Sequence, residues 1–273
     1  MKIVHRRLSL SELLALAWIV GFLLLVTLAR WLPLADPVGI DLSRTLVHPT
    51  PGHWSGTDEL GRDVLSRLIF GGQSTFLVTI GATALAMFLG IVLGLCAGYR
   101  GGLLDRALGF AIDLFWSIPF VIFVILIVSI VGVSPLTLIL TIGGINWVTA
   151  ARVVRAETAR LSREPFVRTA RAYGFGEWSV AFDQVMPNLK SVLITLTVYA
   201  AVEVLTLETG LAFIGLSLPA PRPTWGGLLA DGLSYFSSAW WLVAFSAGAI
   251  TLTLASFQVL AMHFEKSIET RLR

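Results

Sequence analysis

Long apolar runs alternate with short polar segments along nearly the whole chain. A helix needs about 20 predominantly apolar residues to cross a bilayer. Six runs reach or approach that length, at residues 13–32, 75–97, 108–131, 136–151, 192–213 and 240–264. The pattern therefore predicts an all-α, polytopic helical membrane protein with about six transmembrane helices. Asp113 and Pro119 interrupt the third run, and Pro119 predicts a kink there.

The first apolar run follows the basic residues 1–7, as the core of a secretory signal peptide does. A signal-peptide core is typically about 7–15 residues long and is followed by a cleavage site flanked by small residues. This run is longer than that, and no such site follows it. We therefore expect an uncleaved first transmembrane helix.

The composition supports a membrane protein. Apolar residues make up 56% of the chain and charged residues 14%, whereas a soluble domain typically has about 25% charged residues. The single cysteine, Cys96, excludes an intramolecular disulfide and a cysteine-based metal site. The net charge of +3 is concentrated in the segments expected on the cytoplasmic side, so we expect no nucleic-acid partner.

The basic residues predict the orientation. If the N-terminus is cytoplasmic, 15 of the 20 Lys and Arg residues fall on the cytoplasmic side of the predicted spans. Cytoplasmic segments are enriched in Lys and Arg, so both termini and the Arg-rich segment 153–190 are expected in the cytoplasm. The remaining basic residues, expected outside, are Arg30, Arg44, Arg62, Arg67 and Arg222.

The spans divide the chain into three parts. Residues 1–34 are expected to form the cytoplasmic N-terminus and the first transmembrane helix, and residues 35–73 a periplasmic segment. Residues 74–273 would form a five-helix core that includes the cytoplasmic segment 153–190. Within the periplasmic segment, Asp63 is a suitable N-cap for apolar residues at helical spacing, which predicts a short helix on the membrane surface. Those apolar residues are Val64, Leu65, Leu68 and Ile69.

A second outside segment, residues 218–239, is rich in Pro, Gly and Trp. This composition predicts a rigid interfacial loop and not a helix. Trp225, Trp240 and Trp241 suit the level of the outer lipid headgroups, where Trp is enriched.

The segment 153–190 carries too many arginines to lie in hydrocarbon. It could be a solvated basic loop or a docking helix. Phe166, Val167, Ala170 and Tyr173 recur at helical spacing and predict one apolar face, which would need a partner if exposed. Gly174 would allow a positive φ after this short helix, and Pro187 would stop the next one.

Three stretches resemble a known family. GTDELGRDVLSRLIFGG (residues 56–72) and ETGLAFIGLSLPAPRPTWGGLLADG (residues 208–232) resemble the permease subunits of dipeptide, oligopeptide and nickel ABC importers. Between them, FVRTARAYG and the later MPN resemble the cytoplasmic E-A-A-x3-G loop of bacterial importer permeases. Arg168 and Thr169 replace the first two letters of that pattern, and the C-terminal tail lacks the ending typical of the family.

The resemblance implies a type I ABC importer permease in the bacterial inner membrane. Its expected partners are a second permease, two ATP-binding cassette subunits, a periplasmic or lipid-anchored solute-binding protein and the lipid bilayer. No cofactor is expected on this chain, and ATP would be used by the partner subunits. The periplasmic motif would comprise Gly56, Thr57, Asp58, Gly61, Arg62 and Asp63, and the ATPase-coupling residues would be Phe166, Val167, Arg168, Thr169, Ala170, Arg171, Tyr173, Gly174 and Pro187.

No phosphate-binding loop or other catalytic motif is present, so we expect no enzyme activity from this chain. Three carboxylates lie in or beside the spans, where acidic residues are costly and commonly functional. Asp113 would pair with Arg106 or cap a helix, and Glu208 would brace the outer loop or a permease–permease interface. Glu203 is the better candidate for the transport pathway. It lies about 140° around a helix from Glu208, so the two carboxylates should face different partners.

Other functions remain open at this point. A proton-driven secondary transporter using these carboxylates would predict inverted repeats, which the sequence does not display, and a membrane-embedded enzyme would need a convergent catalytic set. A nickel or metal-chelate importer is a further alternative. Bare nickel would need strong ligands in its pathway, whereas a peptide-like solute needs only weak polar groups. We therefore expect a peptide-like solute, with polarity from Thr141, Asn146, Thr195 and Thr197.

Overall fold

The computed structural model describes residues 9–117, 119–216 and 218–272, so the basic N-terminal residues 1–7 lie outside the described residues. The described part is helical, with two isolated β-bridges in its loops. The helices are α1 (Leu10–Leu28), α2 (Val64–Arg100), α3 (Gly102–Ser117), α4 (Phe120–Val131), α5 (Pro135–Leu161), α6 (Pro165–Ala172), α7 (Glu177–Ser179), α8 (Met186–Asn188), α9 (Lys190–Phe213), α10 (Trp225–Leu233) and α11 (Trp240–Leu272).

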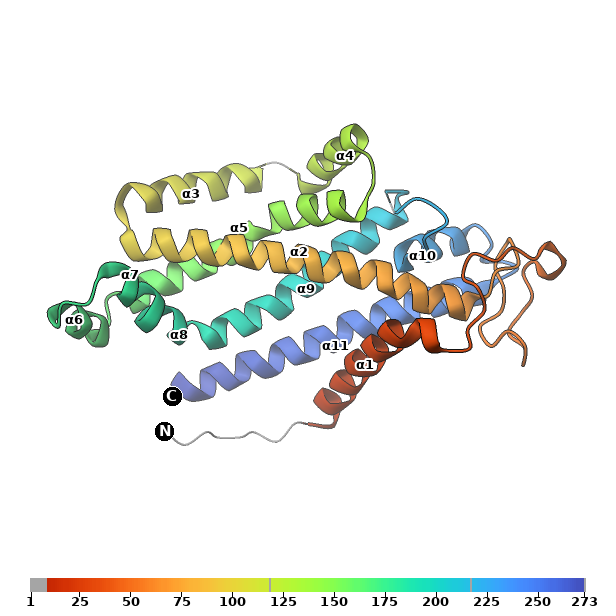
Figure 1. Ribbon diagram of the computed structural model, residues 1–273, viewed down its shortest axis with the longest axis horizontal. Coiled ribbons are helices and arrows are strands. Elements are labelled where there is room, and N and C mark those ends of the chain that lie inside the picture. Colours follow the sequence, from red (N-terminus) through yellow and green to blue (C-terminus); the bar gives the residue numbers. More distant parts are fainter. Residues whose placement is uncertain (1–8, 118, 217, 273) are drawn as a thin grey trace.

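The long helices lie side by side in an elongated bundle (Figure 1). Helices α6, α7 and α8 gather at one end of it, and α10 and the loop before α2 gather at the other. Among the described residues, five helices are long and apolar enough to cross a membrane, and α3 with α4 forms a pair bent by 82° that would make six. The prediction of an all-α polytopic membrane protein is confirmed.

Helices α2 and α5 form the centre of the bundle and make its most extensive helix contact. A stripe of glycines on α2 lets the two backbones approach. A Cβ atom added at Gly98 would stand 2.4 Å from the carbonyl oxygen of Arg155, and one at Gly94 would stand 2.8 Å from that of Ala151. Small residues are the usual device for such close packing between membrane helices. The sequence analysis missed this spacing of Gly90, Gly94 and Gly98.

Helix α2 begins where the sequence predicts, because the side chain of Asp63 accepts a hydrogen bond from the backbone N–H of Ser66 (2.8 Å). The helix then runs without interruption to Arg100. The expected separate surface helix is therefore wrong: residues 64–73 are the first turns of the span. Their apolar side chains continue the same core, since Leu68 and Phe76 pack in one cluster with Trp225.

The segment 218–239 contains a helix, α10, where a loop without helix was predicted. The Thr224 hydroxyl caps it by accepting a hydrogen bond from the backbone N–H of Gly227 (3.1 Å). Burial of Trp225 and Leu228 then outweighs the low helix propensity of the glycines. Trp225 and Trp241 are buried too, with their indole N–H groups donating to the carbonyl oxygens of Leu68 and Thr57. Protein side chains, and not lipid, therefore surround these two indole rings.

Pro119 does more than kink the third predicted span: it separates α3 from α4. Helix α5 extends beyond the short fourth span expected at residues 136–151, to Leu161. Its polar extension is held by an ion pair between Arg155 of α5 and Asp105 of α3. This ion pair helps to explain why α5 continues beyond the end of the apolar run at residue 151.

Candidate functional site

The Arg-rich segment folds as a compact cap on one end of the bundle (Figure 1). Pro165 opens α6 at a position where a proline's missing N–H costs nothing. Gly174 follows the helix with a φ of +83°, as predicted, and has open space where a side chain would stand. The turn sends the chain back towards the membrane through α7 and α8.

The inward face of α6 anchors it to the bundle. Val167 and Ala170 are buried in a cluster with Leu95 of α2, Val154 of α5 and Leu189. The sequence analysis predicted that these two residues share one apolar face with Phe166 and Tyr173, which would need a partner if exposed. For Val167 and Ala170 that partner is the rest of the chain, which covers them.

The outward side of the segment is aromatic and basic. Tyr173 is 81% exposed, and Phe175, Trp178 and Phe182 are each about half exposed. The rings of Trp178 and Phe182 stack with centroids 6.0 Å apart. Arg168 and Thr169 are also exposed on α6. We call the surface formed by Phe166, Arg168, Thr169, Tyr173, Phe175, Trp178 and Phe182 the aromatic end surface.

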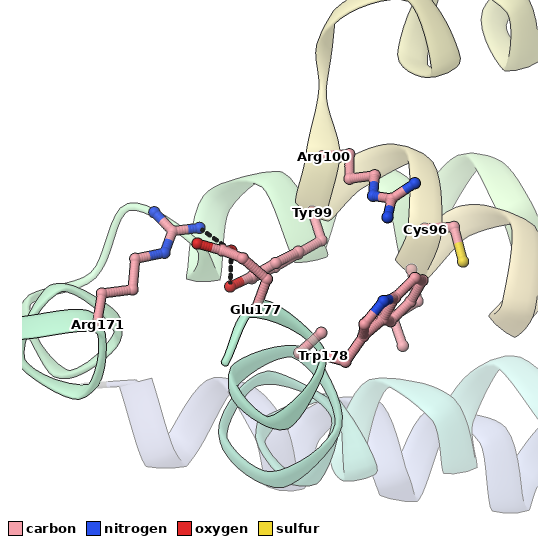
Figure 2. A pocket seen from close by; sticks show the side chains of 8 residues that line it. Cys96, Tyr99, Arg100, Arg171, Glu177 and Trp178 are labelled. Atoms are coloured by element: carbon pink, nitrogen blue, oxygen red, sulfur yellow. Dashed lines mark hydrogen bonds and ion pairs between the residues drawn. The ribbon is translucent and has the colours of Figure 1, made fainter. Parts of the chain in front are cut away.

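A hydrogen-bonded link joins this segment to the end of α2 (Figure 2). The Tyr99 hydroxyl donates to a carboxylate oxygen of Glu177 (2.7 Å), and the Arg171 guanidinium donates to the same oxygen (3.2 Å). The hydrogen bond from Tyr99, together with the nearby Arg171 charge, holds the pKa of Glu177 below its usual value of 4.5. Glu177 is therefore ionised at neutral pH, and the link is intact there.

The same three residues line a cavity of about 240 Å³ with Cys96, Arg100 and Trp178 (Figure 2). The Arg100 guanidinium lies 4.9 Å from the centre of the Trp178 ring, a cation–π contact. Both contacts tie the segment to α2. A displacement of α6 and α7 would therefore be transmitted directly to a membrane-spanning helix.

Pro187 does not stop a helix, contrary to the sequence expectation. It lies in α8, directly after a π-helical turn at Val180–Val185, and the path continues into α9. A proline ring clashes with the carbonyl group four residues earlier in an α-helix. The wider π-helical turn avoids that clash, and the Asn188 side chain donates to the carbonyl oxygen of Gln184 (2.7 Å).

The motif expected in the periplasm forms a tightly hydrogen-bonded loop before α2, which we call the charged loop. The buried Asp58 carboxylate accepts hydrogen bonds from the backbone N–H groups of Leu60 and Arg62, both at 2.9 Å, and pairs with the guanidinium groups of Arg62 and Arg67. At Gly61, which has a φ of +72°, an added Cβ would stand 1.8 Å from the carbonyl oxygen of Asp41. These motif residues shape the loop.

The other motif residues stabilise the two ends of the charged loop. The Thr57 hydroxyl donates to the carbonyl oxygen of Arg44 (2.5 Å) and accepts from the backbone N–H of Val47 (2.8 Å). Gly56 adopts a φ of +74°, and Asp63 bonds to the ring of His53 (3.0 Å) as well as capping α2. Across the described ranges, no cluster of three or more His, Cys, Asp or Glu side chains is placed to hold a metal ion.

The three carboxylates face different surroundings. Asp113 lies 3.7 Å from Arg152, and not beside Arg106 as one reading of the sequence expected. Glu208 is buried beside the hydroxyls of Thr75 and Thr209, where α9 meets α2. Glu203 instead lines a cavity between α9, α5 and the α3–α4 bend. The sequence correctly separated Glu203 from Glu208 by helix geometry.

Within the described residues, five to six helices that are long and apolar enough to cross a membrane define the class: this is an integral, multi-pass membrane protein. The chain belongs to the family described as the binding-protein-dependent transport system inner membrane component, whose profile matches residues 90–271. That match includes the candidate coupling segment. It confirms the resemblance seen in the sequence and assigns the protein to the inner membrane.

Several curated relatives match almost the whole chain. It is 31% identical over 275 residues to the dipeptide transport system permease protein of Bacillus subtilis, covering 98% of this chain and 85% of the relative. It is 28% identical over 267 residues to the oligopeptide transport system permease protein of the same organism (96% and 87%). The oligopeptide permease protein of Haemophilus influenzae is 33% identical over 254 residues (91% and 80%).

Proposed function

We propose that this chain is one permease subunit of an ATP-driven importer of peptide-like solutes. Family membership over residues 90–271 is the observation that carries the proposal, and the names of the relatives point to dipeptides and oligopeptides. The chain would form half of the translocation pathway with a second permease. A solute-binding protein would deliver the solute from outside.

The aromatic end surface is the proposed contact with a separate ATPase subunit. Exposed aromatic side chains with adjacent arginines are typical of protein–protein interfaces. ATP binding by the partners would pull on α6, and the contacts of Tyr99 and Arg100 would pass the movement to α2. The permease pair would then shift between an outward-facing and an inward-facing packing, a population shift between two states.

In the proposed orientation, α6 and both chain ends face the cytoplasm, and the charged loop before α2 faces the periplasm. The bias of Lys and Arg along the sequence supports this orientation. In the structure, the C-terminal end of α11 lies towards the same end of the bundle as α6 (Figure 1).

Transport by the assembled complex in proteoliposomes tests the proposal. With a binding protein outside and ATP inside, we expect uptake of labelled di- or oligopeptides without any ion gradient. Peptide uptake driven by a proton gradient in the absence of ATP would refute the ATP-driven mechanism. Uptake of free nickel, and of no peptide, would refute the solute class.

A further inference from the structure

A cavity of about 350 Å³ opens between α9, α5 and the bend that joins α3 to α4. Its walls are mostly apolar and aromatic, but α5 contributes Asn146 and Thr149 and α9 contributes Glu203. Pockets that bind small molecules have this character: about 300–1,000 Å³, apolar walls and a few placed polar groups. The apolar walls include Phe115, Trp116, Phe120, Ile145 and Leu207.

Asn146 has hydrogen-bonding capacity to spare. Its side chain is only 7% exposed, and its amide nitrogen has no hydrogen-bond partner within the described part of the chain. A buried donor without a partner destabilises the protein, because it has lost its hydrogen bonds to water. A ligand carbonyl or carboxylate in the cavity would relieve that destabilisation.

Glu203 supplies the complementary group. Its carboxylate accepts hydrogen bonds, and among the described residues it makes no ion pair. The other two carboxylates that the sequence analysis singled out have neighbours, with Arg152 beside Asp113 and two threonines beside Glu208. A carboxylate within a span is costly to keep unless it serves a pathway or a partner.

A second, wholly apolar recess adjoins the first. It has a volume of about 220 Å³ and shares Phe115, Phe120 and Ile145 with the cavity. An amide donor, a carboxylate acceptor and an adjacent apolar recess together match a peptide. The peptide offers a carbonyl group, an amino group and a side chain within a few ångströms of one another.

We propose that this cavity is a transient binding station for the transported peptide within the membrane, an inference that rests on the proposed function. Glu203 accepts hydrogen bonds from the peptide's terminal ammonium group, and Asn146 donates to a peptide carbonyl. The apolar recess receives a side chain. The station thus selects peptides with a free amino terminus, in addition to any selection by the binding protein.

Uptake by the complete transporter tests the station through Glu203→Gln and Asn146→Leu. A hydrogen bond to a charged group contributes about 1.5–3 kcal/mol, so we expect Glu203→Gln to slow uptake of a free-amine peptide about tenfold or more. ATP hydrolysis stimulated by the binding protein should persist. The matched control is Thr206→Val on the exposed side of α9, whose hydroxyl bonds only its own helix, and it should transport normally.

Glu203→Gln should also lose the preference for peptides with a free amino terminus. The ratio of uptake between a peptide and its N-acetylated form should fall towards one in Glu203→Gln, relative to the unmodified chain with the same binding protein. Because both transporters use the same binding protein, its own preference contributes equally to the two ratios and does not affect their difference. An unchanged ratio together with unchanged uptake would overturn the station.

Thiol protection supplies a measurement that does not depend on the activity of those variants. In a Cys96→Ala background, a thiol-specific reagent should modify Thr149→Cys more slowly during ATP turnover when peptide is present. Equal rates with and without peptide would refute the station. So would loss of the second permease from purified Glu203→Gln complexes, because Glu203 would then serve the subunit interface. Absence of peptide uptake by the unmodified transporter would refute the proposed function itself.

Discussion

At the scale of single residues, Gly174 shows how a local backbone requirement sets the position of a whole element. Its φ of +83° turns the chain after α6, and nothing lies within 4 Å of the place where its Cβ would stand. Gly176, two residues later, also has open space but a φ of −63° that any residue tolerates. The pair therefore separates backbone strain from the effect of side-chain bulk.

We predict that Gly174→Val strains this turn by about 1–2 kcal/mol, because a left-handed φ places Cβ against the backbone. The variant should insert into the membrane normally but retain less ATPase subunit on purification and transport little. The control Gly176→Val should behave like the unmodified chain. Normal transport by Gly174→Val would show that the position of α6 does not depend on this turn.

At the scale of elements, the contact between α2 and α5 holds the bundle together. It brings α2 against the helix that carries Asn146, and it depends on glycines that leave no room for a side chain. On α5, Gly144 has no atom within 4 Å of its Cβ position, so an alanine fits there. The two helices thus provide a crowded glycine and an open one in comparable helical settings.

Gly98→Ala should force α2 away from α5, because the new Cβ would meet the Arg155 carbonyl oxygen at 2.4 Å. Overpacking of this kind costs about 1–3 kcal/mol. Gly144→Ala should be neutral or stabilising by up to about 1 kcal/mol, since alanine favours helix. Thermal unfolding in detergent, followed by circular dichroism, measures both. A lower midpoint for Gly144→Ala than for Gly98→Ala would contradict the packing described above.

At the scale of the whole molecule, the charged loop lies at one end of the bundle and the aromatic end surface lies at the other. Asp58 with its two arginines shapes the first end, and α6 with its turn shapes the second. The proposed orientation places the charged loop in the periplasm. A labelling experiment on spheroplasts decides between the two orientations.

In a Cys96→Ala background, a cysteine at Gly52 should react with a membrane-impermeant thiol reagent added to spheroplasts, because this position is exposed and unobstructed. A cysteine at Ser162, at the end of α5, should react only after the membrane is permeabilised. The opposite labelling pattern would show that the protein has the reverse orientation in the membrane, and α6 could then not contact a cytoplasmic ATPase.

The sequence by itself determined the features that depend on local chemistry. The apolar runs predicted where the membrane-spanning helices lie, since a bilayer demands about 20 apolar residues per helix, but not the polar or mixed extensions of α2 at its start and of α5 at its end. Asp63 marked the start of α2 because an aspartate satisfies free N–H groups at a helix start. Gly174 marked a turn because only glycine enters a left-handed φ without strain.

Only the tertiary structure decided which surfaces remain free. Helical spacing grouped Val167 with Tyr173, but α2 and α5 cover the former and leave the latter exposed. Spacing also separated Glu203 from Glu208 without showing that only Glu203 faces a cavity shared with Asn146. Burial depends on which distant helices approach each face. That approach is set by packing between segments far apart in the chain, such as the glycines of α2 against α5. The spacing of those glycines marks a face for close packing but does not say which helix will pack on it.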